Sequence, residues 1–547
     1  MRDRGTGSPR TAVALAAALA VAAGGSPAGT VAPSPPRAGG IGVAQRSGGA
    51  GAGAAELAAR VREFRRRNEG RIVRELAELV AIPNVSTDAE GLRANAGRIL
   101  EMLSRRGIGA RLLHDHGGPS VVYGEIGPPD AARAVVLYAH YDGQPADPGR
   151  WTSPPWTPVL RDGPLPGGRR VPLDRDGPIP GEWRLFGRSA ADDKASIVAL
   201  LWALDALRAA GEAVSVRLKF FFEGEEEAGS AGLRKLIERH LEILSSDAWI
   251  FCDGPVHPTR RPQVVFGVRG QLGMELAVYG AVRPLHSGHY GNWAPNPAAL
   301  LADLLASMRD PDGRILIDGY YEDVRPITAA ERRALAGIPQ ADAELRRALL
   351  LRETEAGDAP LAERIMLPAL NVRGLSSGEV GELATNSIPT EARASIDFRL
   401  VPDQTPGRVR ALVEGHIRKR GFHLVRGRPD PGTRAAHPLI ARVEWEDGYA
   451  AMRTSMEHPA ARALMRVVGE ATGGRAIAVP TLGGSLPLQP LARVLGVPLI
   501  VLPIANHDDN QHAPDENLRL QNLWDGIEVF AVMMARLGEV WEEEASR

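Results

Sequence analysis

Apolar and polar positions along the first half of the chain follow two different periods. From residue 56 an amphipathic pattern predicts a long helix that ends at Pro83, and a second helix fits residues 90–106. Short apolar runs and helical patterns then alternate, with strands predicted at 134–139, 214–222 and 249–252 and helices at 195–210 and 233–244. This alternation is typical of an α/β fold in which helices flank a mainly parallel sheet.

The pattern changes after residue 270. Strands are predicted at 272–279 and 394–400, and helices at 296–308 and 406–420. We therefore expect a smaller α+β domain over residues 270–447. It is inserted between the two parts of the larger domain, residues 56–269 and 448–547, and the second part carries a predicted helix at 458–469 and a strand at 498–504.

The N-terminal segment has the layout of a targeting sequence. Basic residues precede an apolar run at 11–23, and small residues follow it at 26–28, which predicts a signal peptide over residues 1–28. The run is shorter than the roughly 20 residues of a membrane-spanning helix, so an uncleaved anchor is the less favoured alternative. Residues 29–55 are rich in Gly, Ala and Pro and predict a flexible linker. We expect an exported bacterial protein, periplasmic or extracellular, without stable membrane association after cleavage.

Composition narrows the choice of partners. The 547 residues exceed what one compact core usually holds, which favours two domains. Lys and Arg (65) nearly balance Asp and Glu (66), and this argues against nucleic acid as a partner. Cys252 is the only cysteine, so no intramolecular disulfide can form.

Five potential metal ligands each follow a short apolar run: His140, Asp192, Glu227, Asp253 and His512. In open α/β sheets, ligands collect at the carboxyl ends of the strands. Two imidazoles and three carboxylates can hold a pair of zinc ions if one carboxylate bridges them. Such a centre activates water at neutral pH, so the pattern predicts a hydrolase.

Each of these residues also has a simpler interpretation. His140 and Asp142 could belong to an ordinary turn after a strand, and Asp192 could cap a helix. Asp253 precedes a glycine, as in a common turn, and His512 could be an exposed loop histidine. In the functional interpretation, Asp142 orients the imidazole of His140.

The carboxylate run at residues 223–227 is a special case. It contains four glutamates directly after an apolar strand, and Gly229 follows it closely. A charge run is usually a solvated face, but here some carboxylates must lie near the core, where a cation would compensate their repulsion. We assign Glu227 as a metal ligand and Glu226 as the general base.

Several motifs resemble those of one family of enzymes. They are H-Y-D-G, G-R-S-A-A-D-D-K, E-G-E-E-E-A-G-S, F-C-D, L-H-S-G, N-S-I-P and F-R-L-V-P, in this order. Over nearly all of residues 56–538 the chain resembles the dizinc aminoacylase, succinyl-diaminopimelate desuccinylase, glutamate carboxypeptidase and carnosinase family of metallopeptidases. The segment G-Y-Y-E-D-V-R-P-I-T at 319–328 is most similar to the dipeptidase and carnosinase branch.

The resemblance implies a ligand arrangement and a cofactor of two zinc ions. One zinc takes His140 and Asp253, the other takes Glu227 and His512, and Asp192 bridges them with a cis peptide bond after it. Asp142 matches the residue that orients the histidine ligand, and Glu226 matches the catalytic base.

The resemblance also makes the inserted domain a lid and a homodimer interface. His286 then stabilises the oxyanion from the partner subunit, Asn386 contacts the substrate, and Arg399 binds the substrate carboxylate. Gly484 and Ser485 belong to a loop that lines the same pocket. As simpler interpretations, Arg399 could be a salt-bridged strand arginine and His286 a dimer-contact residue.

Three features depart from the family pattern. Ser189 and Ala195 stand where the family usually has glycine, which could tighten the loop around Asp192. Residues 162–182 are rich in Gly, Pro and Arg and predict a long surface loop, which could narrow the substrate entrance.

Together these observations predict a dizinc exopeptidase, a dipeptidase or carboxypeptidase that acts on small peptides with a free C-terminal carboxylate. An N-acyl amino acid deacylase or another amidohydrolase is the first alternative. An exported zinc- or peptide-binding protein without catalysis is the second.

Overall fold

A computed structural model describes residues 53–114, 118–484 and 488–547. The predicted signal peptide (1–28) and nearly all of the predicted linker (29–55) lie outside these residues. None of the helices in the described ranges is long and apolar enough to cross a membrane.

The larger sheet has eight strands in the order β1-β2-β6-β3-β7-β19-β8-β18. They are β1 (Gly109–Leu113), β2 (Val121–Ile126), β3 (Ala134–His140), β6 (Arg217–Glu223), β7 (Ala248–Phe251), β8 (Gln263–Val265), β18 (Ile477–Val479) and β19 (Leu499–Val501). Strand β3 runs parallel to both β6 and β7, and β7 runs parallel to β19. Antiparallel pairs join β2 to β1 and β6. The prediction of an α/β fold with a mainly parallel central sheet is confirmed.

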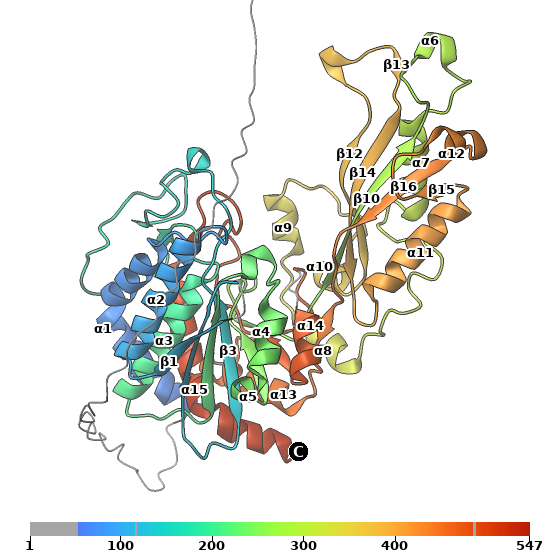
Figure 1. The fold of residues 1–547 in the computed structure, drawn as a ribbon. Coiled ribbons are helices and arrows are strands. Elements are labelled where there is room, and N and C mark those ends of the chain that lie inside the picture. Colours follow the sequence, from blue (N-terminus) through green and yellow to red (C-terminus); the bar gives the residue numbers. More distant parts are fainter. Residues whose placement is uncertain (1–52, 115–117, 485–487) are drawn as a thin grey trace, which may run out of the picture. The chain divides into compact units, whose positions relative to one another are not determined.

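Helices cover both faces of this sheet (Figure 1). The first face packs on α1 (Ala54–Val80), α2 (Ala89–Arg105), α3 (Lys194–Ala209), α13 (Pro459–Ala471) and α15 (Leu520–Ala545). The second face packs on α4 (Leu233–Arg239), α5 (Leu241–Leu244) and α14 (Leu488–Leu495). Along β3, Val135 and Leu137 join the first core while Val136 and Tyr138 join the second. The strand is therefore a continuous apolar run, because successive side chains point to opposite, equally buried faces.

A second sheet lies within the predicted insertion, with strands in the order β12-β14-β10-β16-β15. These are β10 (Gly270–Tyr279), β12 (Ala369–Ser376), β14 (Glu391–Leu400), β15 (His423–Val425) and β16 (Ile440–Trp445). Alternate residues of β10, Leu272, Met274 and Leu276, are buried with apolar residues of α7 (Pro297–Met308) and α11 (Pro406–Lys419). The period of two in the sequence therefore reflects one face of β10 that packs on helices.

Shorter elements complete the described chain. They are β9 (Gly267–Val268), β11 (Leu285–His286), α6 (Ser287–Tyr290), α8 (Ala329–Gly337), α9 (Asp342–Ala348), α10 (Leu361–Ile365), β13 (Ser387–Ile388), α12 (Pro431–Ala436) and β17 (Met452–Arg453).

The predicted surface loop at 162–182 connects β4 (Val159–Arg161) to β5 (Arg184–Phe186), and β5 also pairs with β20 (Asn517–Arg519). Glu69 on α1 accepts a hydrogen bond from the amide of Ile179, and the amide of Gln521 on α15 donates to Gly181 at 2.7 Å. The loop therefore packs on α1 and α15. Among the described residues it forms no hydrogen bond to a predicted metal ligand, and its effect on the substrate entrance stays a prediction.

Several elements have no predicted counterpart, and two differences are instructive. The helix expected at 233–244 is divided at His240 into α4 and α5. Helix α15 has no predicted counterpart. Between Ile527 and Met534 every residue of α15 is buried, so this stretch lacks the one-sided apolar stripe by which an amphipathic helix is recognised.

Candidate metal centre

Three of the predicted ligands lie at the carboxyl ends of parallel strands, at one edge of the larger sheet. His140 is the last residue of β3, and Asp253 comes two residues after β7. Strand β6 ends at Glu223 and leads into a single 3₁₀ turn, Glu226–Ala228. Because β3 runs parallel to β6 and β7, these chain segments meet at the carboxyl ends of three adjacent strands.

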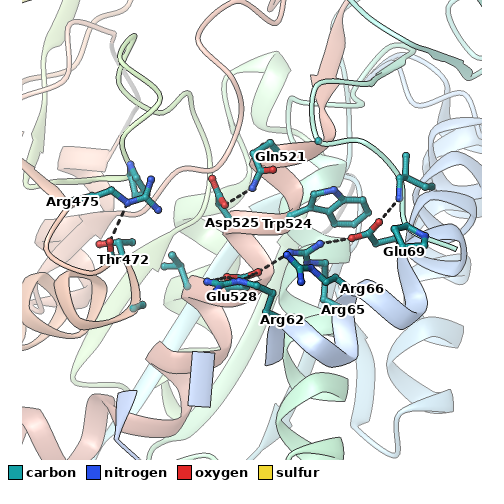
Figure 2. A pocket seen from close by; sticks show the side chains of 16 residues that line it. Arg62, Arg65, Arg66, Glu69, Thr472, Arg475, Gln521, Trp524, Asp525 and Glu528 are labelled. Atoms are coloured by element: carbon teal, nitrogen blue, oxygen red, sulfur yellow. Dashed lines mark hydrogen bonds and ion pairs between the residues drawn. The ribbon is translucent and has the colours of Figure 1, made fainter. Parts of the chain in front are cut away.

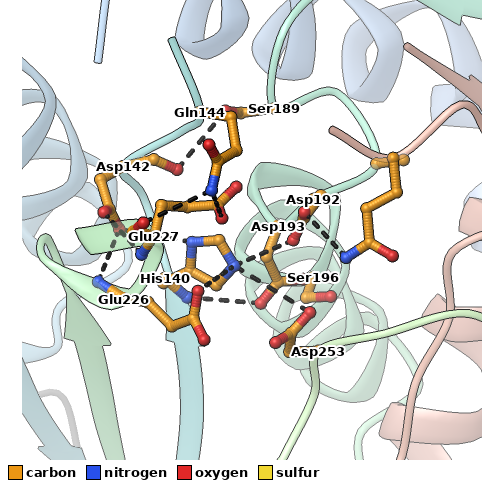
Figure 3. Close-up of polar contacts among 12 residues, drawn as sticks. His140, Asp142, Gln144, Ser189, Asp192, Asp193, Ser196, Glu226, Glu227 and Asp253 are labelled. Atoms are coloured by element: carbon orange, nitrogen blue, oxygen red, sulfur yellow. Dashed lines mark hydrogen bonds and ion pairs between the residues drawn. The ribbon is translucent and has the colours of Figure 1, made fainter. Parts of the chain in front are cut away.

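His140, Asp192 and Asp253 form a first buried group whose potential ligand atoms all lie within 4.8 Å of one another (Figure 3). The Nε2 atom of His140 is 3.0 Å from Oδ1 of Asp192 and 4.0 Å from Oδ1 of Asp253. One imidazole and two carboxylates at this spacing can hold a divalent cation.

Asp192 also belongs to a second group, with Glu227 and His512. The Nε2 atom of His512 is 3.1 Å from Oδ2 of Asp192 and 3.1 Å from Oε2 of Glu227. Asp192 thus turns one carboxylate oxygen toward each group. The peptide bond between Asp192 and Asp193 is cis, as the resemblance implied.

Asp142 joins the two strand ends. Its Oδ1 lies 3.4 Å from Nδ1 of His140 and accepts a hydrogen bond from the amide of Glu226 at 3.1 Å. Its Oδ2 accepts from the amide of Glu227 at 3.0 Å. One buried carboxylate therefore fixes both the imidazole and the turn that carries the two glutamates.

The cluster concentrates negative charge in a buried place. Burial raises the pKa of Asp253 to about 7, with a further contribution from the charge of Asp192. Burial also raises the pKa of Glu226 well above its ordinary value; the charge of His140 opposes the rise, and those of Asp253 and Glu227 add to it. In the described part of the chain, Oδ1 of Asp253 has no hydrogen-bond partner. This donor set fits divalent cations, which would neutralise the repulsion between the carboxylates.

A family model decides what kind of protein carries this cluster. The model of peptidase family M20/M25/M40 matches residues 136–536. The chain belongs to this family. The family is metal-dependent, so the prediction of a metallopeptidase is confirmed.

Curated relatives and solved structures agree with this membership. The chain is 25% identical over 490 residues to the Cys-Gly metallodipeptidase dug1 of Schizosaccharomyces pombe, covering 86% of this chain and 96% of the relative. It is 26% identical over 445 residues to the Beta-Ala-His dipeptidase of Homo sapiens, covering 77% and 78%. Among solved structures, the M20 family metallo-carboxypeptidase Sso-CP2 of Sulfolobus solfataricus has 28% identity and a TM-score of 0.69, covering 86% of this chain and 99% of the other. The resemblance to the carnosinase-like dipeptidase branch is thus confirmed.

The same relatives correct the predicted localisation. The first of them are Cys-Gly metallodipeptidases of yeasts and Beta-Ala-His dipeptidases of mammals, which are eukaryotic proteins. The signal peptide on which the prediction depended lies outside the described residues. On this comparison the prediction of bacterial export is wrong.

In this M20-family peptidase, Glu516 is a site residue that the sequence analysis missed. Its buried carboxylate accepts hydrogen bonds from the amides of Ser189, Ala191 and Asp192 at 3.0–3.1 Å and from Nη1 of Arg188 at 2.8 Å. Glu516 therefore holds the loop that presents Asp192. The only sequence signal was its place four residues after His512, in an acidic loop that could equally have been solvated.

Two glutamines were also missed. Gln511 donates from Nε2 to Oδ2 of Asp192 at 2.9 Å, and Gln144 donates to Oε2 of Glu227 at 2.9 Å. Both amides hydrogen-bond to carboxylates of the second group and can orient them. Glutamine is common on surfaces, so neither position stands out in the sequence.

Ser189 adopts a left-handed conformation with φ of 63°. Glycine adopts this conformation without steric cost, whereas serine does not. The serine side chain compensates through its hydroxyl, which accepts a hydrogen bond from Nδ2 of Asn84 at 2.8 Å. Ala195, the other departure from glycine, is fully buried in α3.

The predicted substrate residues lie elsewhere in the chain. His286 is exposed at the end of β11, and its Nδ1 accepts from the amide of Gly288. The carbonyl of Asn386 accepts from the amide of Ser287 at 2.9 Å. Within the described ranges, no hydrogen bond or ion pair joins His286 or Asn386 to the metal-ligand groups.

Arg399 and Gly484 lie outside the cluster as well. Arg399 is on β14 and donates from Nε to Oδ2 of Asp397 at 2.8 Å. The carbonyl of Gly484 accepts from the amide of Arg269 at 3.3 Å, and Ser485 lies outside the described residues. The sequence analysis did not single out Tyr449. Burial raises the pKa of its hydroxyl to about 12; the charge of Arg399 opposes this rise and the charge of Glu226 adds to it.

Proposed function

We propose that this protein is a dipeptidase with two zinc ions, which hydrolyses the amide bond of small peptides that carry a free C-terminal carboxylate. One observation carries the proposal: two groups of ligands share the single carboxylate of Asp192. His140 and Asp253 would hold one zinc, Glu227 and His512 the other, with Asp192 between them. The dipeptidase names of the relatives support the substrate class.

When bound, the zinc ions supply Lewis-acid chemistry, which polarises the peptide carbonyl and lowers the pKa of water. Glu226 is the proposed general base. Its Oε2 lies 4.0 Å from Nε2 of His140, next to both ligand groups. As the water oxygen forms the new C–O bond, the Glu226 carboxylate takes the proton that the water releases. It then transfers this proton to the amide nitrogen as the C–N bond breaks.

Asp142 acts on this step through two neighbours. It accepts the amide hydrogen bond of Glu226 and lies beside the imidazole of His140, so it positions the base relative to the ligands. The substrate would be held by residues of the inserted segment, with Arg399 binding the C-terminal carboxylate and Asn386 contacting the peptide. Gly484 and Ser485 would line the same pocket. The planar guanidinium of Arg399 suits the binding of the substrate carboxylate, because it can donate two parallel hydrogen bonds to a carboxylate.

A homodimer is part of the proposal, since His286 is assigned to the oxyanion of the partner subunit's substrate. Large apolar side chains are exposed in β12 and in the segment that leads to Asn386, which directly precedes β13. Leu375, Val380 and Leu383 are all more than half exposed. Such exposure in a soluble protein is typical of a surface that a partner covers.

The test is product analysis by mass spectrometry. Metal-loaded protein is incubated with one pool of dipeptides and one pool of N-acyl amino acids, with and without a chelator. Loss of dipeptides that the chelator prevents is the expected result. Loss of only the N-acyl amino acids would replace the proposal by a deacylase, and loss from neither pool with zinc bound would replace it by a binding protein.

A further inference from the structure

A polar pocket of about 620 Å³ lies among α1, α13, α15 and the 162–182 loop, and none of the predicted metal ligands lines it (Figure 2). A volume of this size is in the range of small-molecule sites, about 300–1,000 Å³. Four arginines face three carboxylates around it: Arg62, Arg65, Arg66 and Arg475 against Glu69, Asp525 and Glu528. We propose that this pocket is a second ligand site, which binds a small molecule that carries carboxylate or phosphate groups.

Two of the three carboxylates are already occupied. Glu528 accepts from Nε and Nη2 of Arg62 and, at 2.8 Å, from Nη2 of Arg65. Glu69 accepts from Arg65 and from the amide of Ile179. These hydrogen bonds compensate the negative charges of Glu528 and Glu69. The two carboxylates therefore repel a bound anion less than unpaired carboxylates would.

Two arginines of the pocket have no carboxylate partner among the described residues. Among the residues that the structure describes, neither Arg66 nor Arg475 forms an ion pair, and the hydrogen bond that Arg475 donates goes to the carbonyl of Thr472 at 3.1 Å. Figure 2 shows Arg475 on one side of the pocket and the arginines of α1 on the other, with Asp525 between them. Unpaired guanidiniums on two sides suit a ligand that presents oxygen atoms at both ends.

The wall of the pocket is held in place by buried groups. The guanidinium of Arg65 lies 5.3 Å from the centre of the Trp524 ring, and both side chains are buried. A cation over an indole face is held by the electrostatics of the ring. The lining is therefore preorganised, which reduces the entropy cost of binding.

Asp525 is the one carboxylate without an arginine partner. It accepts a hydrogen bond from Nε2 of Gln521 at 2.7 Å. Burial raises the pKa of Asp525, while the hydrogen bond from Gln521 and the charges of Arg475 and Arg65 lower it.

The 162–182 loop gives the pocket its specific shape. Pro178, Ile179 and Gly181 form one side, and the hydrogen bonds to Glu69 and Gln521 hold them there. This assigns a role to the segment that departs from the family pattern in the sequence. In this proposal the segment shapes an anion site on the helices.

The test measures binding by isothermal titration calorimetry at constant ionic strength, with metal-loaded protein and two probes, inorganic phosphate and glutarate. The variants are Arg66→Gln, Arg475→Gln and the double variant. Arg67→Gln is the matched control, because Arg67 is the next residue of α1, is exposed, pairs with Glu63 and does not line the pocket. Each variant's melting temperature without probe is measured as a check of folding.

The expected result is saturable binding of at least one probe by the wild type, with a Kd that rises about tenfold or more in the double variant. The Kd of Arg67→Gln should stay within about twofold. Tighter binding of phosphate than of glutarate would assign the ligand to the phosphates, and the reverse order to the carboxylates. The proposal is overturned if neither probe saturates, if the double variant binds like the wild type, or if Arg67→Gln loses as much affinity as the double variant.

Discussion

The carboxylate of Glu516 accepts a hydrogen bond from the backbone amide of Asp192 at 3.1 Å. Through this bond a residue near the C-terminus of the chain holds the carboxylate that two ligand groups share. The same carboxylate also accepts from the amide of Ala191, so the whole turn is held. The geometry of the two candidate ligand groups therefore depends on a residue that belongs to neither of them.

Replacing Glu516 should consequently weaken metal binding. In Glu516→Gln an amide group would face backbone N–H donors, and the loop that carries Asp192 would lose part of its support. We expect zinc affinity to fall about 10- to 100-fold, measured by competition with a chromophoric chelator. Glu539→Gln, an exposed position on α15, is the control. Unchanged zinc affinity in Glu516→Gln would show that the loop is held without this carboxylate.

The two ligand groups predict a pattern of metal content. Asp253→Ala should retain about one zinc per chain and His512→Ala about one, because each change removes a ligand from only one group. Asp192→Ala should lose both, since both groups contain it. Zinc would be counted by mass spectrometry after gel filtration, with His507→Ala as the control in the same loop as His512. Two zinc ions retained in Asp192→Ala would contradict the bridging role.

Replacing the proposed base should separate catalysis from metal binding. Glu226→Gln keeps the side-chain volume but removes the basic carboxylate. We expect kcat on a dipeptide to fall at least about 10²-fold while the zinc content stays the same. Glu225→Gln is the matched control, because Glu225 accepts a hydrogen bond from the amide of Gly232 and is not a proposed base. Turnover within a few-fold of the wild type in Glu226→Gln would rule out the proposed mechanism.

Asp508 should make stability depend on acid pH. Burial alone would raise its pKa, but the hydrogen bond and charge of Arg184, together with Asn506 and Arg519, lower it to about 2 from an ordinary value of 3.8. The folded state therefore binds this proton less tightly than the unfolded state. The stabilisation is fully present above about pH 4 and is lost as the pH falls toward 2.

Denaturant unfolding of Asp508→Asn at several pH values tests this. Near pH 6 the variant should be less stable by about 1 kcal/mol, since solvent screens a carboxylate whose side chain is 39% exposed. Toward pH 2 the two proteins should converge, because the wild-type carboxyl is then protonated as well. A difference that does not change between pH 6 and pH 2 would mean that the ion pairs with Arg184 and Arg519 contribute nothing.

The proposed dimer can be tested at its exposed apolar residues. Val380→Asp places a charge on a side chain that is 85% exposed, and it should convert a dimer to a monomer in light scattering. Leu350→Asp is the control, because Leu350 is also highly exposed but lies between α9 and α10. A wild-type protein that is monomeric and fully active would remove the role given to His286.

Local pattern was sufficient for the longer central elements of both sheets. The run at 134–139 became β3 (Ala134–His140), and the period of two at 272–279 became part of β10 (Gly270–Tyr279). Both follow from one rule, that side chains alternate across a strand and the buried face is apolar. No such periodic pattern predicts α15, because a central stretch of this helix is buried on all sides.

The candidate metal ligands could be selected from the sequence because their chemistry is unusual at strand ends. A buried histidine or carboxylate at the end of a strand is costly unless something compensates it, and this holds for His140 and Asp253. Gln144, Gln511 and Glu516 carry no such signal. They act only because folding brings them to carboxylates and amides that are distant in the sequence.

The α/β architecture, the family and the five candidate ligands could be predicted from the sequence alone, since these depend on periodicity and on residue chemistry that is local in the chain. Two features became visible only in the folded chain: which oxygen of Asp192 faces each ligand group, and the packing of the 162–182 loop on α1 and α15. Hydrogen bonds and ion pairs between distant segments depend on atomic positions, and these are fixed only when the strands and helices pack together.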